Sequence, residues 1–343
     1  MKLVSYLANN KEHLGLFVEN KIYNLAENAK LIGKQLPDSM AAFLNDGNDA
    51  MKIAHEVNTG ITNNTIKAIT ANISTDALLA PVPHPTSCRD GYAFRQHVEA
   101  ARRNRKVPMI TEFDQYPIFY FTNHNAIQGP GDIVCMPDHF QKLDFELEVS
   151  IVIGKKGRNV KAADADSYIA GYMIMNDMSA RTLQMEEMAL NLGPAKGKDF
   201  STVIGPWLVT PDELEPYKTA PKNGHVGNAY DLPMTCKVNG KIVSQGNMNS
   251  MDWTFAEIIE RCAYGVDILP GDVIGSGTVG TGCFLELNGT GLLNDPNYKV
   301  QWLQPNDVVE MEIRGLGHLS NTIRKDNSDF SILALKKMAE TTA

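Results

Sequence analysis

The segment Leu143 to Gly154, LDFELEVSIVIG, constrains the fold of this 343-residue chain more than any other. Each odd position from 143 to 153 is apolar, which is the period-two pattern of a β-strand with one face in a core. Asp144, Glu146 and Glu148 therefore project from the opposite face, with successive carboxylates about 7 Å apart. Three neighbouring negative charges repel one another unless solvent or a positive charge compensates them.

Two interpretations of this acidic face remain open. In the first, a half-buried antiparallel strand exposes its carboxylates to solvent. In the second, the carboxylates hold a hard cation such as Mg²⁺ or Ca²⁺, because oxygen ligands suit these ions whereas zinc favours imidazole or thiolate. Asp177 follows a buried strand and Asp90 precedes a probable helix, so both could join such a site, and capping a helix is their alternative role.

Composition narrows the class of protein. The chain has 32 Lys and Arg against 40 Asp and Glu, a net charge of −8, so we expect no nucleic-acid partner. The one basic run, Arg95 to Lys106, is typical of a helix face or of the wall of an anion-binding pocket. The five cysteines are far apart and predict buried free thiols in a reducing compartment. The N-terminal region has no long apolar stretch, so we expect a cytoplasmic protein without membrane contact.

The order of elements predicts an α+β, β-rich fold. Residues 1–80 predict a small N-terminal β domain and residues 81–343 a larger catalytic domain, joined by the proline-rich ALLAPVPHP. Asn239-Gly240 predicts a hairpin turn, and the capping box of Thr254 and Glu257 predicts a helix that runs to Ala263. Strands and helices do not alternate regularly, which argues against a doubly wound sheet.

A nucleotide-dependent enzyme is a competing class, because Gly275 to Gly280 matches G-x-G-x-x-G after an apolar strand. The CFLELNG segment that follows has a strand pattern, so we expect no helix N-terminus there to receive a pyrophosphate. Gly193 to Asp199 misses the phosphate-binding loop pattern by one residue and has no Ser or Thr after Lys198. Both observations disfavour nucleotide binding.

Several short blocks, in order over about residues 82 to 320, resemble the fumarylacetoacetate hydrolase family. They are D-G-Y-A-F-R-Q-H (90–97), F-E-L-E (145–148), N-D-M-S-A-R-T-L-Q (176–184), G-K-D-F-S-T (197–202), G-P-W (205–207), P-G-D-V-I-G-S-G-T (270–278) and L-E-L (285–287). The resemblance implies a homodimeric enzyme with a small N-terminal β domain and a catalytic domain of mixed β-roll type. It also implies a divalent metal, Mg²⁺ or alternatively Ca²⁺ or Mn²⁺.

The resemblance further implies roles for single residues. The implied metal ligands are Asp90, Glu146, Glu148 and Asp177, with Lys198 and Thr202 beside the metal. The implied catalytic residues are His97 as base, Glu286 as its support, and Gln184 and Lys198 as donors toward a developing oxyanion. The candidate substrate-binding residues are Tyr92, Arg102, Arg181 and Thr278, with Arg103 or Arg105 as alternatives to Arg102. Taken alone, His97 could be a structural histidine, Lys198 a loop lysine and Glu286 a solvent-facing residue at a strand end.

The implied reaction is hydrolysis of a carbon–carbon bond in a small β-dicarbonyl acid, with fumarylacetoacetate as the first candidate substrate, cleaved to fumarate and acetoacetate in aromatic catabolism. A metal polarises a chelating 1,3-dicarbonyl, and a histidine with a carboxylate partner can activate water. Acylpyruvate hydrolysis, 2-oxo-acid decarboxylation and isomerisation of related acids are alternatives that use the same chemistry. A metal-binding partner protein without activity is a third class.

Overall fold

The structure is a computed structural model that describes residues 1–74 and 77–337. Within these residues the strands form one ten-stranded and one five-stranded sheet, besides three two-stranded pairs. The large sheet has the order β3 (Lys21–Asn24), β2 (Lys11–Val18), β1 (Lys2–Ala8), β13 (Thr202–Val209), β11 (Ile169–Asp177), β9 (Leu147–Ile153), β19 (Val273–Gly275), β4 (Cys88–Gly91) and β5 (Phe119–Thr122), with β6 (Ile127–Gln128) beside β13.

The five-stranded sheet packs on the large sheet along β9, β11 and β13. Its order is β17 (Lys241–Asn247), β16 (Pro233–Val238), β20 (Val308–Ile313), β21 (Gly317–Lys325) and β7 (Gly131–Cys135). The pairs are β10 (Gly157–Arg158) with β18 (Asp267–Ile268), β12 (Ser179–Ala180) with β8 (Leu143–Asp144), and β14 (Lys218–Thr219) with β15 (Ala229–Tyr230). Apolar residues of β9 and β11, such as Val149 and Ile174, form one core with Cys236 and Met311 of the smaller sheet.

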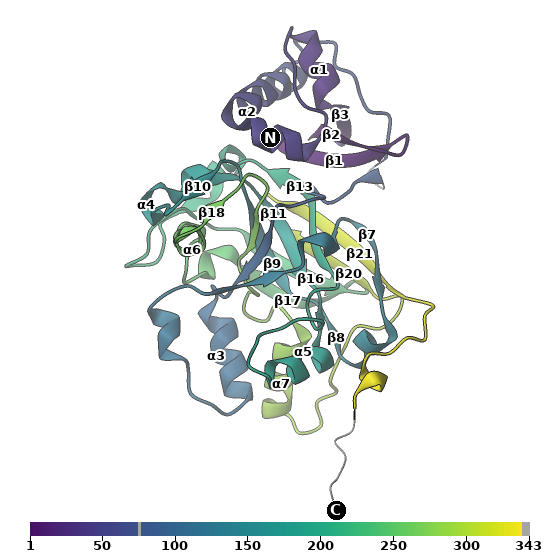
Figure 1. Ribbon diagram of the computed structural model, residues 1–343, viewed down its shortest axis with the longest axis vertical. Helices are drawn as coiled ribbons and strands as arrows, with labels where there is room; N and C mark the ends of the chain where they lie inside the picture. Colours follow the sequence, from purple (N-terminus) through teal and green to yellow (C-terminus); the bar gives the residue numbers. More distant parts are fainter. Residues whose placement is uncertain (75–76, 338–343) are drawn as a thin grey trace, which may run out of the picture.

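The helices lie around these sheets (Figure 1). They are α1 (Leu25–Leu31), α2 (Met40–Thr62), α3 (Arg95–Asn104), α4 (Ala162–Ala165), α5 (Arg181–Met188), α6 (Phe255–Ala263) and α7 (Phe284–Asn294). The predicted α+β, β-rich class is therefore confirmed. No helix in the described part of the chain is both long and apolar enough to cross a membrane. All five cysteines are buried and unpaired, as the sequence predicts.

The N-terminal strands extend the large sheet, because β1 pairs antiparallel with β13. Figure 1 shows β1–β3, α1 and α2 as a purple lobe at one end of the molecule. Phe43 and Leu44 of α2 share a core with Val152 of β9 and Ile204 of β13. The N-terminal segment is thus joined to the main body by both backbone pairing and side-chain packing, and a domain division near residue 80 stays a prediction.

The predicted strand from Leu143 to Gly154 is interrupted. Residues 143–144 form β8 and residues 147–153 form β9, while Phe145 and Glu146 lie between them outside any strand. Of the two interpretations of the acidic face, exposure to solvent is wrong, because every residue from 143 to 153 is buried. The reason is that β9 is a central strand, with Val149 and Ile151 in one core and Val152 in the other.

Two local predictions are confirmed and one is wrong. The Asn239-Gly240 turn connects β16 to β17 as a hairpin, and Thr254 and Glu257 form the capping box of α6. The CFLELNG segment is not a strand, because Phe284 begins helix α7 with Cys283 as its N-cap. The start of the helix is stabilised by Asp144, which accepts hydrogen bonds from the backbone N–H groups of Phe284 and Leu285. Because Asp144 is distant in sequence, local periodicity does not encode this contact.

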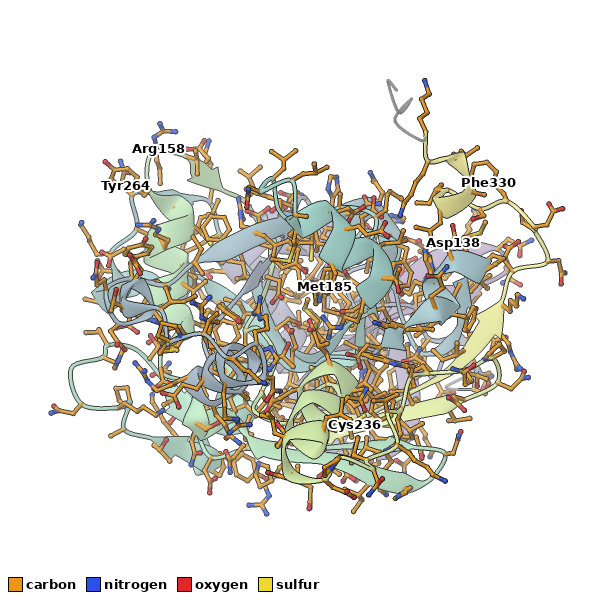
Figure 2. All side chains as sticks on the ribbon, turned by 90° about the horizontal axis from the view of Figure 1, so that it is seen from below. Asp138, Arg158, Met185, Cys236, Tyr264 and Phe330 are labelled. Atoms are coloured by element: carbon orange, nitrogen blue, oxygen red, sulfur yellow. The ribbon has the colours of Figure 1, made fainter. Side chains whose placement is uncertain are left out.

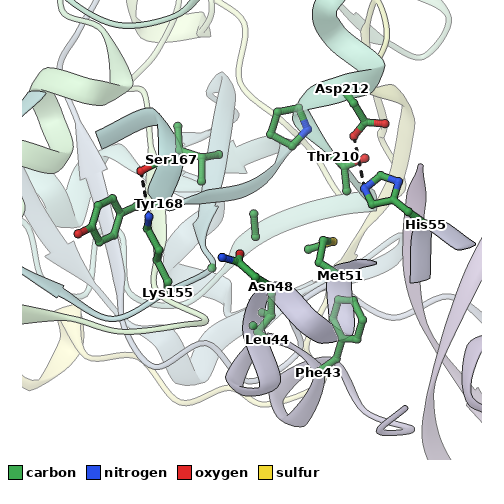
Figure 3. Close-up of a pocket in the computed structure, with 15 residues that line it drawn as sticks. Phe43, Leu44, Asn48, Met51, His55, Lys155, Ser167, Tyr168, Thr210 and Asp212 are labelled. Carbon is green, nitrogen blue, oxygen red and sulfur yellow. Dashed lines mark hydrogen bonds and ion pairs between the residues drawn. The ribbon is translucent and has the colours of Figure 1, made fainter. Parts of the chain in front are cut away.

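A cavity of about 110 Å³ lies between α2 and the ends of the central strands, where β9 and β13 finish and β11 begins (Figure 3). Gly47, in a non-helical conformation with φ 63° and ψ −136°, kinks α2 at this point. Phe43 and Met51 supply apolar wall, while Lys155 donates a hydrogen bond to Ser167 across the opening. The carboxylates of β9 and β11 lie toward the other end of these strands.

Replacing Phe255 with alanine should destabilise the protein by about 3–5 kcal/mol, because the change leaves a void in the core. Phe255 is 2% exposed and packs edge-on against Tyr172, with ring centroids 6.0 Å apart. Urea unfolding of both forms measures the loss. Tyr264→Ala is the control, since Tyr264 is 83% exposed at the periphery (Figure 2) and should change the unfolding free energy by less than about 0.5 kcal/mol. Equal losses would contradict this core assignment.

Candidate active site

Four carboxylates from four segments converge in the large sheet. Asp90 lies on β4, Glu148 on β9 and Asp177 at the end of β11, while Glu146 precedes β9. One oxygen from each lies within 4.8 Å of the others, and all four residues are at most 5% exposed. Neither aspartate caps a helix: Asp252 accepts the hydrogen bond from the first N–H of α3, and α5 has no side-chain cap.

Gly275 of β19 permits this convergence. β19 lies between β4 and β9, and Gly275 pairs with Asp90 on one side and with Ser150 on the other. A Cβ atom at Gly275 would lie 2.4 Å from Asp90 Oδ1 and 2.8 Å from Met175 Sδ. Only glycine therefore lets the Asp90 carboxylate occupy this space.

The cluster has too much negative charge for the positive groups that the described residues supply. Burial, and then repulsion from Asp177, raises the pKa of Asp90 to about 7. Burial followed by neighbouring carboxylates also raises the pKa of Glu148 well above its usual value. Glu148 Oε2 and Asp177 Oδ1 accept no hydrogen bond from any described residue. Buried unpaired carboxylate oxygens in a set of four fit a hard divalent cation, so the residues present suit Mg²⁺, Mn²⁺ or Ca²⁺.

Lys198 and Arg181 compensate part of this charge. Lys198 Nζ donates to Asp177 Oδ2 at 2.6 Å and also to Glu146. Burial alone would raise the pKa of Glu146, but the Lys198 ammonium and then the Arg181 guanidinium outweigh it and lower this pKa to about 2. Lys198 is thus a buried charge partner of the cluster and not an ordinary loop lysine.

The Arg181 guanidinium donates hydrogen bonds to three side chains within the protein. Its Nη2 donates to Glu146 Oε1 at 2.7 Å, and its Nε donates to Asp144 Oδ2 at 2.9 Å. Nη1 donates to Gln184 Oε1 at 2.9 Å, and the Gln184 amide NH₂ has no acceptor among the described residues. The geometry makes Arg181 a charge partner of buried carboxylates, and its substrate contact stays a prediction. Gln184 stays a candidate oxyanion donor.

His97 and Glu286 form a buried pair beside the cluster. His97 Nδ1 lies 2.6 Å from Glu286 Oε2, and Glu286 Oε1 accepts a hydrogen bond from Thr281 N at 2.9 Å. A ring nitrogen of His97 lies within 4.8 Å of a Glu146 oxygen. A carboxylate at Nδ1 favours the tautomer with the proton on Nδ1, so Nε2 keeps the lone pair that a base needs. Glu286 is 4% exposed, because it lies on α7 and not at a solvent-facing strand end.

The predicted substrate-binding residues lie around this pair. The Tyr92 ring meets the His97 ring edge-on, with centroids 5.9 Å apart. Burial raises the pKa of Tyr92, and the charges of Arg105 and, more weakly, Arg102 act against this rise. Arg103 instead donates to Thr290. The structure thus favours Arg105 and Arg102 over Arg103 as neighbours of Tyr92.

The last two predicted residues lie at the cluster itself. Thr278 Oγ1 donates to Glu148 Oε1 at 3.4 Å, so it contacts a carboxylate of the cluster. Thr202 is 1% exposed and pairs with Asp177 across β11 and β13. Both positions agree with a place beside a bound ion.

The sequence did not indicate the roles of three further residues, Tyr120, Asn176 and Asp144. Tyr120 of the edge strand β5 donates a hydrogen bond to Asp177, and Asn176 accepts one from Glu146 N at 3.0 Å. Asp144 shares the predicted acidic face but lies outside the group of four, and its contacts with α7 were not foreseen. Tyr120 could only have been found by pairing β5 with β4, since its register places it opposite Asp90.

These features together are those of an enzyme that gathers a histidine–glutamate pair and a carboxylate cluster in one buried site. The chain belongs to the fumarylacetoacetate hydrolase family: the family model described as "Fumarylacetoacetate (FAA) hydrolase C-terminal" matches residues 86–324.

Curated relatives share nearly the whole chain. It is 29% identical over 332 residues to a protein of Rattus norvegicus named oxaloacetate tautomerase Fahd2a, mitochondrial, and this match covers 94% of the chain and 91% of the relative. The human protein named oxaloacetate tautomerase FAHD2A, mitochondrial, is 30% identical with the same coverage. These names give a tautomerase activity to the relatives. Because they also place the relatives in mitochondria, the expected cytoplasmic location stays a prediction.

Solved structures with lower identity share the fold. A fumarylacetoacetate hydrolase from Exiguobacterium antarcticum superposes with a TM-score of 0.68 at 23% identity, covering 95% of this chain and all of that one. A maleylpyruvate hydrolase from Sphingobium has a TM-score of 0.65 at 20% identity, with coverage of 95% and 100%. The two-sheet architecture is therefore that of the family.

Removing the divalent metal should lower the melting temperature, and adding Mg²⁺ or Mn²⁺ should restore it. A ligand at 100 times its Kd stabilises the folded state by about 2.7 kcal/mol. Glu148→Gln should lose most of this gain. Its metal-free form should melt close to the metal-free wild type, because burial and the neighbouring carboxylates raise the pKa of Glu148 and so disfavour the charge that glutamine removes. Calorimetry with and without a chelator measures both effects, and equal metal-induced shifts in the two proteins would exclude Glu148 as a ligand.

Proposed function

We propose that the protein is a divalent-metal-dependent enzyme that moves a proton between carbon and oxygen in a short 2-oxo dicarboxylic acid. The first candidate reaction is the keto–enol tautomerisation of oxaloacetate. The observation that carries the proposal is the His97–Glu286 pair, which places a base within 4.8 Å of a carboxylate of the candidate metal cluster. Relatives named for this activity, which match 94% of the chain, support it.

A metal held by Asp90, Glu146, Glu148 and Asp177 would polarise the 2-oxo group and make the adjacent C–H bond more acidic. His97 Nε2 takes the proton from carbon 3, and Glu286 stabilises the imidazolium that forms. The same imidazolium returns the proton to the substrate oxygen, so the net reaction changes only one C–H and one O–H bond. The burial of His97, at 8% exposed, limits proton exchange with bulk water.

Arg105 and Arg102 fit the second carboxylate of such a substrate. Each arginine anchors its Nε to a backbone carbonyl, Arg102 to Pro108 at 2.7 Å and Arg105 to Ala101 at 3.1 Å. These contacts leave the Nη groups of both side chains for an anion, and both charges act on Tyr92. A guanidinium binds a carboxylate in a two-pronged geometry, so this side of the site favours dicarboxylic acids.

Hydrolysis of a carbon–carbon bond in a β-dicarbonyl acid is the second candidate, with fumarylacetoacetate as its substrate. The Gln184 amide and the Lys198 ammonium favour it, because hydrolysis passes through a tetrahedral oxyanion that needs such donors, whereas tautomerisation does not. Acylpyruvate hydrolysis and 2-oxo-acid decarboxylation belong to the same group of alternatives. The family resemblance supports a homodimer as the working assembly, which light scattering tests.

A substrate panel separates these candidates. With Mg²⁺ or Mn²⁺ present, we expect rapid loss of the enol absorbance of oxaloacetate and slower cleavage of fumarylacetoacetate and acylpyruvates. Chelation should abolish each enzyme-dependent rate, and added metal should restore it. Full activity in a demonstrably metal-free preparation contradicts the proposed chemistry. Cleavage of fumarylacetoacetate that is faster than the tautomerisation of oxaloacetate would favour the second candidate.

His97→Ala should keep metal binding and lose most turnover, by about 10²- to 10⁴-fold in kcat, because the base is removed while the carboxylate cluster stays intact. Metal affinity is measured by titration with Mn²⁺ and kcat by the oxaloacetate assay. His84→Ala is the control, since the His84 side chain is 73% exposed and pairs with Glu12 at the surface. An unchanged kcat in His97→Ala would mean that another residue is the base.

A further inference from the structure

Asp144 joins the two halves of the site without belonging to the carboxylate cluster. It is 0% exposed. Its Oδ1 accepts hydrogen bonds from Phe284 N at 2.7 Å and Phe145 N at 3.0 Å. Its Oδ2 accepts from Leu285 N and from Arg181 Nε, both at 2.9 Å, and Arg181 Nη2 lies 2.8 Å away. Both oxygens are therefore fully used as acceptors.

One set of these donors leads to the base. Phe284 and Leu285 are the first two residues of α7, and Glu286 is the third. Asp144 thus fixes the first turn of α7, where a negative charge also stabilises the free N–H groups. Glu286 extends from this turn to His97 Nδ1 at 2.6 Å. The orientation of the His97 ring consequently depends on where α7 begins.

The other donor leads to the carboxylate cluster. Arg181 uses one edge of its guanidinium for Asp144 and donates from Nη2 to Glu146 Oε1 at 2.7 Å. Glu146 is one of the four converging carboxylates, and the short segment that carries it lies outside any strand. No ladder of a sheet holds Glu146, so its side chain is held by Arg181 and Lys198, and Arg181 is held by Asp144.

We propose that Asp144 is a positioning residue that sets the location of the His97–Glu286 pair relative to Glu146 and hence to the substrate. This inference rests on the proposed proton transfer by His97. The competing account is that Asp144 only caps a helix and stabilises the fold. The two accounts differ in whether loss of Asp144 acts through His97.

Asp144→Asn is the most conservative probe of this role. An asparagine side chain has the same shape, but its NH₂ group cannot accept a hydrogen bond. The NH₂ group would therefore face N–H donors that now bond to an Asp144 oxygen, and the donors would repel one another. We expect α7 to shift by a fraction of an ångström. A misplacement of about 1 Å costs on the order of 10²-fold in rate, so kcat should fall by about 10- to 100-fold. KM and the affinity for Mn²⁺ should change by less than about threefold, because the substrate arginines and all four carboxylates are kept and Lys198 still holds Glu146.

A double-mutant cycle with His97→Ala tests whether Asp144 acts through the base. If it does, Asp144→Asn should lower kcat in the wild-type background and change it by less than about twofold in the His97→Ala background. If the two losses multiply instead, Asp144 does not act through His97, and the proposal is overturned. Arg181→Lys gives a second entry to the same cycle should Asp144→Asn fail to fold, because lysine keeps the charge and loses the fork that grips Asp144.

A readout without substrate separates this inference from the proposed function. The hydrogen bond between His97 and Glu286 should give a strongly downfield imidazole proton in the NMR spectrum, assigned by its loss in Glu286→Gln. The signal should weaken or move in Asp144→Asn. It should persist in Asp138→Asn, since Asp138 is a buried carboxylate that accepts from Ser331 and Leu333 elsewhere in the fold (Figure 2).

The combined results test the positioning role of Asp144 and the proposed function separately. An unchanged signal in folded Asp144→Asn overturns the positioning role, whatever the substrate turns out to be. A signal that responds as expected in a protein inactive on every 2-oxo acid tested keeps the positioning role and overturns the proposed function.

Discussion

The site depends on a balance between four buried carboxylates and two buried cationic side chains. Lys198 and Arg181 lower the pKa of Glu146, whereas burial and mutual repulsion raise the pKa of Asp90 and Glu148. Two positive charges cannot neutralise four negative ones when all six residues are at most 5% exposed. The remaining negative charge, together with the unpaired oxygens of Glu148 and Asp177, suits a divalent cation.

The architecture produces this balance by burying both faces of its central strands. β9 has a core on each side, so a carboxylate on it cannot reach solvent and must find partners inside. Neighbouring strands bring those partners: β11 supplies Asp177, and β4 supplies Asp90 across the side-chain-free position of Gly275. A site of this kind needs three strands in fixed register, which a rigid sheet between two packed layers provides.

Sequence periodicity predicted part of the fold and of the site. It identified β9 and predicted that the carboxylates of Glu146 and Glu148 point to the same side, because alternation every second residue is a local property. It did not show that this face is buried, because burial depends on strands distant in sequence. It also assigned α7 to a strand, because the carboxylate of Asp144 that fixes the first turn of that helix lies about 140 residues earlier. The local pattern left Asp90 and Asp177 open between a cation site and helix capping, and only the family resemblance assigned them as ligands, since no local signal shows that the two residues lie close together.

The helix at Phe284 also changes the argument about nucleotide binding. A helix does follow the glycine-rich segment that begins at Gly275, so the absence of a helix N-terminus is not what disfavours a phosphate there. Instead, the N–H groups of Phe284 and Leu285 in the first turn already donate to Asp144, whose carboxylate occupies the place that a phosphate would take. The N-terminus of α7 thus binds a carboxylate of the protein itself in place of an external anion. A single buried carboxylate both closes that end to external anions and ties it to Arg181, which is why the same contact bears on the position of the base.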